Sequence, residues 1–126
     1  MKATSPEEIC RLFQQYMRAG NLEMLLDLYD TEAVFRSEAG ETKTGEELRA
    51  ELAPFAAART AFDFEIKQVI QAGDIALMHT RWRISTPQQQ RTLYAVEVAR
   101  RQADGSWRWL IGDPFTVGRN VVAFAA

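Results

Sequence analysis

The first half of the chain carries hydrophobic residues at the spacing of amphipathic helices. Apolar side chains recur every three or four residues over 9–17, behind Ser5-Pro6-Glu7-Glu8, which supplies an N-cap serine, a first-turn proline and a capping-box glutamate. This stripe ends at Gly20. Leucines after Asn21 predict a second short helix, and a second capping box at 44–47 predicts a third. A short strand is predicted to begin at Ala33.

After residue 60 the periodicity changes from helical to alternating. Gly73-Asp74 and Asp104-Gly105 are turn sequences between the alternating runs. The predicted strands cover 62–66, 75–84, 92–101 and 107–113, with a final edge strand in the tail at Val117, Val121, Val122 and Phe124. Helices followed by hairpins predict an α+β domain, in which the helices cover one face of a curved antiparallel meander.

The alternation divides the long strands into two sets of side chains, and neither set is purely polar. One set is almost entirely apolar: Ala76, Met78, Thr80, Trp82, Ile84, Tyr94, Val96, Val98, Trp107, Trp109 and Ile111. The other mixes apolar and charged residues: Ile75, Leu77, His79, Arg81, Arg83, Leu93, Ala95, Glu97, Ala99, Leu110 and Gly112.

Two interpretations of these faces remain open. In the first, the aromatic face is the core and the charged face is solvated. In the second, the mixed face encloses a pocket with His79, Arg81 and Glu97 on its floor. The aromatic face is then the outer one, and a second subunit covers it, because an exposed apolar patch of that size is typical of a partner site.

Composition narrows the class of protein. With 126 residues, 47% hydrophobic and 25% charged, the chain suits one globular domain over 1–126. A net charge of −2 argues against a nucleic-acid partner, and no apolar run is long enough for a membrane helix. One cysteine, Cys10, and one histidine exclude a structural zinc site, and we expect Cys10 to be a buried thiol. No signal-peptide pattern opens the chain, so a cytoplasmic location is expected.

Several stretches in order resemble the nuclear transport factor 2-like superfamily, which includes SnoaL-like polyketide cyclases, ketosteroid isomerases and the calmodulin-dependent kinase association domain. They are 13–16, 20–23, 28–35, 72–77 and 104–108. The resemblance implies one SnoaL-like domain: a cone in which a strongly curved antiparallel sheet wraps over about three N-terminal helices around an internal pocket. It also implies a homodimer through the outer sheet face, and it favours the second interpretation of the faces.

Family site positions transfer only in part. The ketosteroid isomerase base falls at Ser37 and its helix-1 tyrosine at Phe13, with Tyr16 one turn on, whereas its strand carboxylate falls at Glu97, which matches in type. True ketosteroid isomerase activity is therefore not expected. The polyketide cyclase carboxylate falls on Gly112, one residue from Asp113. The arginine of the association domain matches Arg81.

These residues define a candidate site for a small apolar or carboxylate-bearing molecule. Glu97 and His79 form a candidate acid/base pair, Asp113 is a third candidate, and Arg81 is the candidate anion contact. The predicted ligand-binding walls are Phe13, Tyr16, Phe35, Phe62, Phe64 and Leu110. Some of these residues also have a structural interpretation. Arg81 and Glu97 could form a cross-strand ion pair, Asp113 could fix a turn, and Tyr16 could belong to the core.

The hypothesis is thus a small-molecule-binding protein with acid/base isomerase, cyclase or hydratase chemistry, using no cofactor and no metal. A homodimer is predicted through Trp82, Tyr94 and Trp109 on the outer sheet face. The alternative is a non-catalytic ligand-binding or protein-association module.

Overall fold

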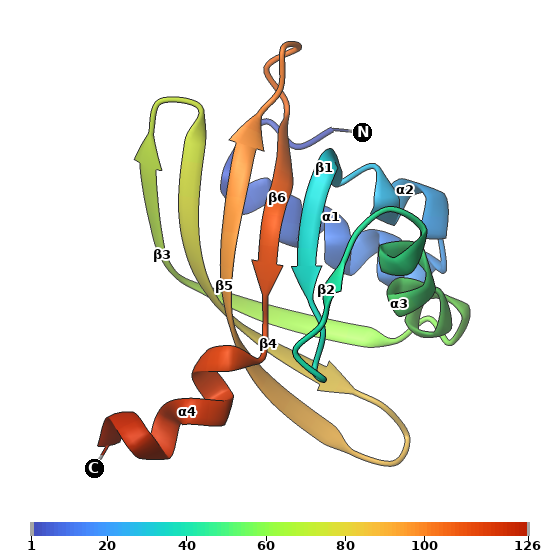
Figure 1. Cartoon of the computed structure of the whole chain (residues 1–126). Helices are drawn as coiled ribbons and strands as arrows, with labels where there is room; N and C mark the ends of the chain where they lie inside the picture. Colours follow the sequence, from blue (N-terminus) through green and yellow to red (C-terminus); the bar gives the residue numbers. More distant parts are fainter. Residues whose placement is uncertain (1, 126) are drawn as a thin grey trace.

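Six strands form one curved, open sheet, and three helices cover one side of it (Figure 1). The computed structural model describes residues 2–125, and the side chains of residues 2–120. In chain order the elements are α1 (Pro6–Ala19), α2 (Leu22–Leu26), β1 (Tyr29–Arg36), β2 (Thr42–Lys43), α3 (Glu46–Ala57), β3 (Ala61–Ala72), β4 (Ile75–Ser85), β5 (Gln90–Arg101), β6 (Trp107–Asp113) and α4 (Thr116–Ala125). The predicted α+β class, with three N-terminal helices, is confirmed.

The strand order is β2-β1-β6-β5-β4-β3. The predicted antiparallel meander is confirmed for β3 to β6, where each strand pairs with the next. The sheet as a whole is mixed, because β1 pairs with β6 in parallel. This pairing places the chain's first strand beside its last. The helix α1 crosses behind β5, β6 and β1, and α2 lies beyond β1, next to α3 (Figure 1).

The predicted signals at both ends of α1 are present. Ser5 is the N-cap and its Oγ accepts a hydrogen bond from the Glu8 N–H at 3.2 Å, with Pro6 at the first helical position. Gly20 ends the helix with φ 69°, a conformation that glycine adopts without steric penalty. A Cβ at Gly20 would lie 3.1 Å from the Ala56 carbonyl oxygen, so this glycine also allows α1 and α3 to pack closely.

The tail is a helix, so the predicted final edge strand is wrong. Pro114 lacks the N–H needed to continue a β ladder, and the Asp113 carboxylate accepts hydrogen bonds from the N–H groups of Phe115 and Thr116 at 3.3 and 3.2 Å. These contacts begin α4 at Thr116. Side chains beyond residue 120, including Val121, Val122 and Phe124, lie outside the described residues.

The register between β4 and β5 changes the predicted faces. Met78 pairs with Glu97 and Trp82 pairs with Leu93, so even-numbered residues of β4 share a face with odd-numbered residues of β5. The sequence-based faces instead grouped even with even, because alternation within one strand does not reveal how the 86–89 loop aligns it with the next. Glu97 therefore lies on the buried face with Trp82, and His79 lies on the opposite face.

A bulge in β6 also changes which residues of that strand face the core. Ala99 pairs with Trp109 and Val98 with Ile111, which leaves Leu110 as the extra residue. Trp109 consequently faces the core at 4% exposure, whereas Ile111 faces outward at 45%.

The core lies between α1 and the inner sheet face. Its largest fully buried side chains are Ile9, Cys10, Leu12, Met17, Leu25 and Met78. Trp82, Trp107 and Trp109 belong to this core, which corrects the prediction that Trp82 and Trp109 form a subunit contact: both are packed inside one chain. The buried thiol predicted for Cys10 is confirmed.

Candidate functional site

A cavity of about 190 Å³ lies between the helices and the inner face of the sheet. Aromatic rings form much of its wall, and its charged residues come from four different segments. It is lined by Phe13, Tyr29, Phe35, Glu38, Glu51, Leu52, Phe55, Phe62, Trp82, Ile84, Arg91, Leu93, Glu97, Trp109, Gly112, Asp113, Pro114 and Phe115.

The aromatic wall is held by edge-to-face packing around Phe13 of α1. The Phe13 ring centroid lies 5.2 Å from that of Phe62, 5.3 Å from that of Trp82 and 5.5 Å from that of Trp109. Such geometry brings the positive edge of one ring to the negative face of another. Interlocked rings on α1, β3, β4 and β6 therefore keep the cavity wall in one arrangement.

Glu97 is the buried polar group of this wall, at 7% exposure. Thr80 Oγ1 donates a hydrogen bond to Glu97 Oε1 at 2.9 Å, and Trp82 Nε1 donates to Oε2 at 3.0 Å. Burial removes water from the carboxyl group and raises its pKa from 4.5 to about 7, although the two donors act in the opposite direction. Both protonation states of Glu97 are therefore populated near neutral pH.

Tyr29 and Cys10 are the other titratable groups near Glu97. Burial raises the pKa of each, and the charge of Glu97 raises both further. The phenol and the thiol accordingly stay neutral across the range in which Glu97 titrates. Tyr29 lines the cavity from the start of β1, and it was missed because the family resemblance placed the functional tyrosine on the first helix.

Charged residues at the more exposed end of the cavity form a second group. Arg91 Nη1 donates to Glu38 Oε1 at 3.0 Å while Nη2 bonds the other carboxylate oxygen, and Arg119 donates to the Glu38 carbonyl oxygen. The Arg91 guanidinium also lies over the Phe115 ring, 5.5 Å from its centroid. Sequence reasoning missed Arg91, Glu38 and Phe115, because they meet only when β5, the β1–β2 loop and the tail converge.

Five predicted site residues lie together on the cavity wall: Phe13, Phe35, Phe62, Glu97 and Asp113. Of these, Asp113 lines the cavity but also forms the turn before α4, as its structural alternative predicted. In the described part of the chain, no group of His, Cys, Asp and Glu is placed to hold a metal ion.

The structure does not bring the remaining predicted residues to the cavity. His79 lies on the outer face of β4, where its Nδ1 is buried and, among described residues, has no hydrogen-bond partner. Arg81 is also on that face, and its Nη2 lies 2.6 Å from Glu65 Oε1. The predicted His79–Glu97 pair and the Arg81–Glu97 ion pair are both wrong, because these side chains project from opposite faces of the sheet.

Three predicted wall residues pack elsewhere. Tyr16 is buried in the core at 7% exposure, as its structural alternative predicted. Phe64 packs behind the wall, with its ring centroid 5.5 Å from that of Trp82. Leu110 is the bulged residue of β6 and does not line the cavity.

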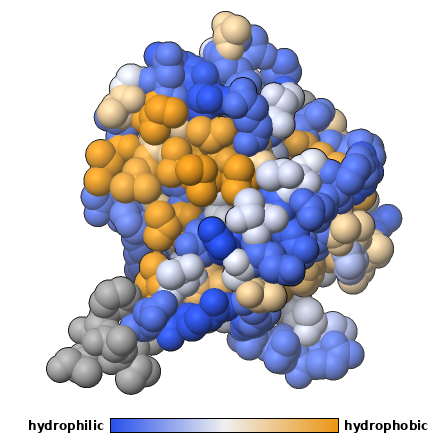
Figure 2. All heavy atoms as spheres, in the orientation of Figure 1, coloured by the Kyte–Doolittle hydropathy of each residue, from blue (hydrophilic) through white to orange (hydrophobic). Residues whose placement is uncertain are grey.

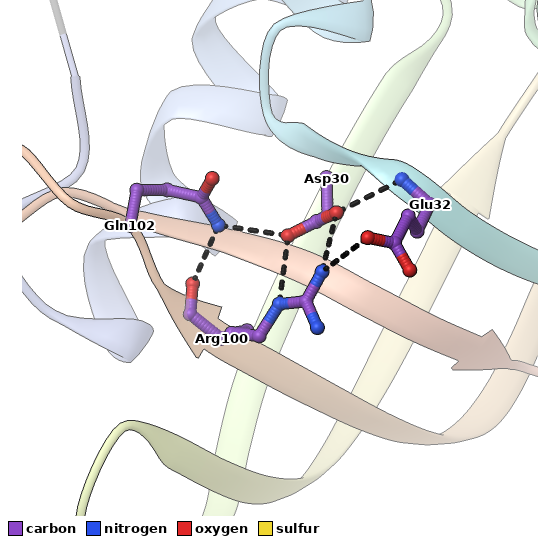
Figure 3. A network of polar contacts seen from close by, with 4 residues as sticks. All are labelled: Asp30, Glu32, Arg100 and Gln102. Carbon is purple, nitrogen blue, oxygen red and sulfur yellow. Dashed lines mark hydrogen bonds and ion pairs between the residues drawn. The ribbon is translucent and has the colours of Figure 1, made fainter.

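A separate polar network joins β1 to β5 outside the cavity (Figure 3). Arg100 donates to both carboxylate oxygens of Asp30 at 3.0 and 2.9 Å, and Gln102 donates to Oδ2 at 2.8 Å. Burial alone would raise the pKa of Asp30, but these bonds and one from the Glu32 N–H outweigh it and lower the pKa to about 2. Both carboxylate oxygens of Asp30 are bonded to other members of the network. We therefore assign the network a structural role.

Comparisons with known proteins support the fold. The family model for the SnoaL-like domain matches residues 10–110. No curated protein matches the sequence. Among residues 2–125, no helix is both long enough and apolar enough to cross a bilayer.

Solved structures similar to the chain have NTF2-like folds. One, from Thiobacillus denitrificans, is provisionally named as a calcium/calmodulin-dependent protein kinase type II association domain; it has a TM-score of 0.76 and 17% identity, over 92% of this chain and 99% of that one. An NTF2-like protein of unknown function from Shewanella oneidensis has a TM-score of 0.73 and 16% identity, over 84% and 92%. An NTF2-like protein from Streptomyces avermitilis, provisionally named a dehydratase, has a TM-score of 0.71 and 20% identity, over 87% and 93%.

Proposed function

The chain belongs to the SnoaL-like domain family, and we propose that its cavity binds a small, largely apolar molecule on which Glu97 acts as an acid/base group. The observation that carries this proposal is the position of the Glu97 carboxyl: it is 7% exposed, and it lines a cavity in which aromatic rings form much of the wall. A general acid or base is most effective when its pKa lies near the working pH. Burial raises the pKa of Glu97 to about 7.

The surroundings of Glu97 suit proton transfer in either direction. Thr80 and Trp82 each donate one hydrogen bond to the carboxyl group and so fix its orientation. A carboxylate has about four acceptor positions, so two remain for a ligand. Isomerase, cyclase and hydratase reactions all begin with such a transfer at or beside a polarised group, and a carboxyl group can perform it without a cofactor.

The reaction of 5-nitrobenzisoxazole with bases tests this proposal without knowledge of the natural substrate. A base removes the proton on C3, the C–H electrons form the third C–N bond, and the N–O bond breaks to release a coloured cyanonitrophenolate. We expect saturable turnover by the wild-type protein, rising with pH as Glu97 ionises near pH 7. Glu97→Gln should reduce the rate by about 100-fold or more, the usual contribution of a general base.

Glu51→Gln is the matched control, because Glu51 lines the same cavity from α3 and is more exposed than Glu97. Its turnover should remain close to that of the wild type. If Glu97→Gln keeps the wild-type rate, Glu97 is not the base. If the wild type binds the probe but releases no phenolate above the buffer rate, the acid/base role fails and the non-catalytic binding module is favoured instead.

We also propose a homodimer through the outer sheet face, on residues that differ from those first predicted. Figure 2 shows hydrophobic surface over β3, β4 and β5 on the side of the sheet away from α1. Among described residues, four of the five exposed large hydrophobics lie on this face: Ile70, Ile75, Tyr94 and Ile111, at 38–49% exposure. Of the predicted contact residues, Tyr94 alone is available to a partner, because Trp82 and Trp109 are buried. An apolar face of this kind favours a second copy of the chain over water.

A further inference from the structure

Within residues 2–120, the Glu97 carboxyl has hydrogen-bond donors but no cationic partner. Its two bonds come from the Thr80 hydroxyl and from the Trp82 indole, which can only donate. Among described residues, no lysine, arginine or histidine side chain forms an ion pair with it. Buried charges in proteins are usually paired, so the ionised form of Glu97 lacks the partner that would offset its burial.

The charged residues that line the cavity are mostly acidic. Among the described lining residues, Glu38, Glu51, Glu97 and Asp113 face one cation, Arg91. Both terminal nitrogens of Arg91 are already bonded to the Glu38 carboxylate. A ligand carboxylate would therefore compete with Glu38 for this cation and would meet like charge on the rest of the described wall, whereas a ligand cation would meet opposite charge.

The aromatic walls also favour a positively charged ligand. Glu97 shares the cavity wall with Phe13, Tyr29, Trp82 and Trp109. The faces of such rings carry partial negative charge and attract ammonium groups, more strongly once water is removed. Rings and carboxylates together make this cavity complementary to a positive group on an apolar body.

We propose that the cavity binds an amine, with its ammonium group against Glu97 and an aromatic or aliphatic ring against the surrounding aromatic walls. The inference rests on the proposed function and specifies its ligand class. An engineered cavity of about 150 Å³ is known to hold benzene, so a volume of about 190 Å³ suits one ring with a short side chain. The amine proposal also replaces the carboxylate-bearing ligand that the predicted position of Arg81 in the pocket implies.

The pH dependence of binding separates this proposal from its main rival. An ammonium group forms an ion pair with ionised Glu97, so the affinity of an amine rises as pH increases through about 7. A neutral ligand oxygen accepts a hydrogen bond from protonated Glu97, so its affinity falls over the same range. The buried Trp109 Nε1, which has no hydrogen-bond partner among described residues, would also favour such an oxygen.

The other titratable groups around Glu97 do not change the expected difference in pH dependence between an amine and a neutral ligand. Cys10 on α1 and Tyr29 on β1 face it, and both remain neutral because burial raises their pKa values. Farther along the cavity are Glu51 of α3, Asp113 of β6 and the Arg91–Glu38 pair, in which Arg91 lowers the pKa of Glu38. His79 of β4 projects from the opposite face of the sheet, so His79→Gln is the matched control variant.

Three probes of matched shape test the proposal: 2-phenylethylamine, 2-phenylethanol and phenylacetate. Their affinities would be measured by isothermal titration calorimetry at about pH 6 and about pH 8. The amine should bind at least about tenfold more tightly than the other two at pH 8. Its affinity should fall about tenfold at pH 6, since a group with a pKa of about 7 changes tenfold in ionised fraction over that interval. His79→Gln should keep this profile, and Glu97→Gln should remove both the preference and the pH dependence.

Each other outcome overturns the proposal. Tighter binding of phenylacetate, or of 2-phenylethanol with affinity falling as pH rises, refutes the amine class while leaving the acid/base proposal for Glu97 in place. Equal amine affinity at the two pH values in the wild type also refutes it, without reliance on any variant. Failure of all three probes to bind contradicts both the amine class and the ligand-binding function of the cavity.

Discussion

The stability of the protein should depend on pH through Glu97, and Glu97→Gln isolates that dependence. The folded state raises the pKa of Glu97 from 4.5 to about 7. Between these values the folded chain holds a proton that the unfolded chain has released. Glu97 therefore contributes stability that is fully present below pH 4.5 and is lost as pH rises through about 7. The amide side chain of the Glu97→Gln variant carries no charge at any pH, so the variant has no such loss.

The size of the effect follows from the two pKa values. Each pKa unit corresponds to about 1.4 kcal/mol, so the full interval from 4.5 to about 7 is worth about 3–4 kcal/mol. Because Glu97 already begins to ionise in the unfolded chain near pH 5, most of this, about 2–3 kcal/mol, is lost between pH 5 and pH 8. The free energy of unfolding of the wild type, relative to that of the variant, should fall by that amount.

Urea unfolding of both proteins at intervals over this pH range, followed by tryptophan fluorescence, measures the difference directly. With a denaturant slope of about 1–3 kcal/mol per molar, a change of about 2–3 kcal/mol shifts the relative midpoint by about 1–3 M. Glu23→Gln is the control: Glu23 is exposed, and the Arg49 guanidinium lowers its pKa, so that pKa lies below this range. A difference between wild type and Glu97→Gln that does not vary with pH would refute the burial argument, and one that rises with pH would mean that a cation faces Glu97 in the free protein.

Three further predictions concern other parts of the molecule. Asp30→Asn should lower the free energy of unfolding by about 2 kcal/mol at neutral pH, because the folded state lowers the Asp30 pKa from 3.8 to about 2. Urea unfolding should show this difference disappear as pH falls through about 2, and a difference that stays constant with pH would contradict the prediction. Asp113→Ala should cost about 1 kcal/mol through loss of the bonds that begin α4, with Asp113→Asn closer to the wild type, whereas a loss of probe turnover as large as that of Glu97→Gln would show an acid/base role instead. Sedimentation velocity at micromolar concentration should show a dimer for the wild type and a monomer for Tyr94→Glu or Ile111→Glu; a monomeric wild type would refute the outer-face homodimer.

The local elements were predictable because their signals lie within a few residues of one another. Ser5, Pro6 and Gly20 bound α1 where the pattern places it, and the turn sequences at 73–74 and 104–105 separate the strands as expected. The parallel pairing of β1 with β6 was not predicted, since no short-range pattern specifies which distant strand becomes a neighbour. The valines of the tail favour a strand, whereas the hydrogen bonds that Asp113 accepts begin a helix.

The candidate site was predictable only in part. Glu97 lines the cavity, but its predicted partners His79 and Arg81 lie on the opposite face, because the pairing of Met78 with Glu97 depends on the alignment of β4 and β5. A shift of one residue in that alignment reverses every side chain of a strand. Tyr29 and Arg91 were missed because the cavity joins segments that are far apart in the chain.

Hydrophobic periodicity, capping residues and turn sequences thus determine the class of this fold and the position of most of its elements, since each acts over one or two turns of chain. Strand register, the bulge at Leu110 and the convergence of the tail on the β1–β2 loop decide which residues meet. These depend on packing between distant segments. The same packing removes water from Glu97, and the function proposed for the cavity depends on that burial.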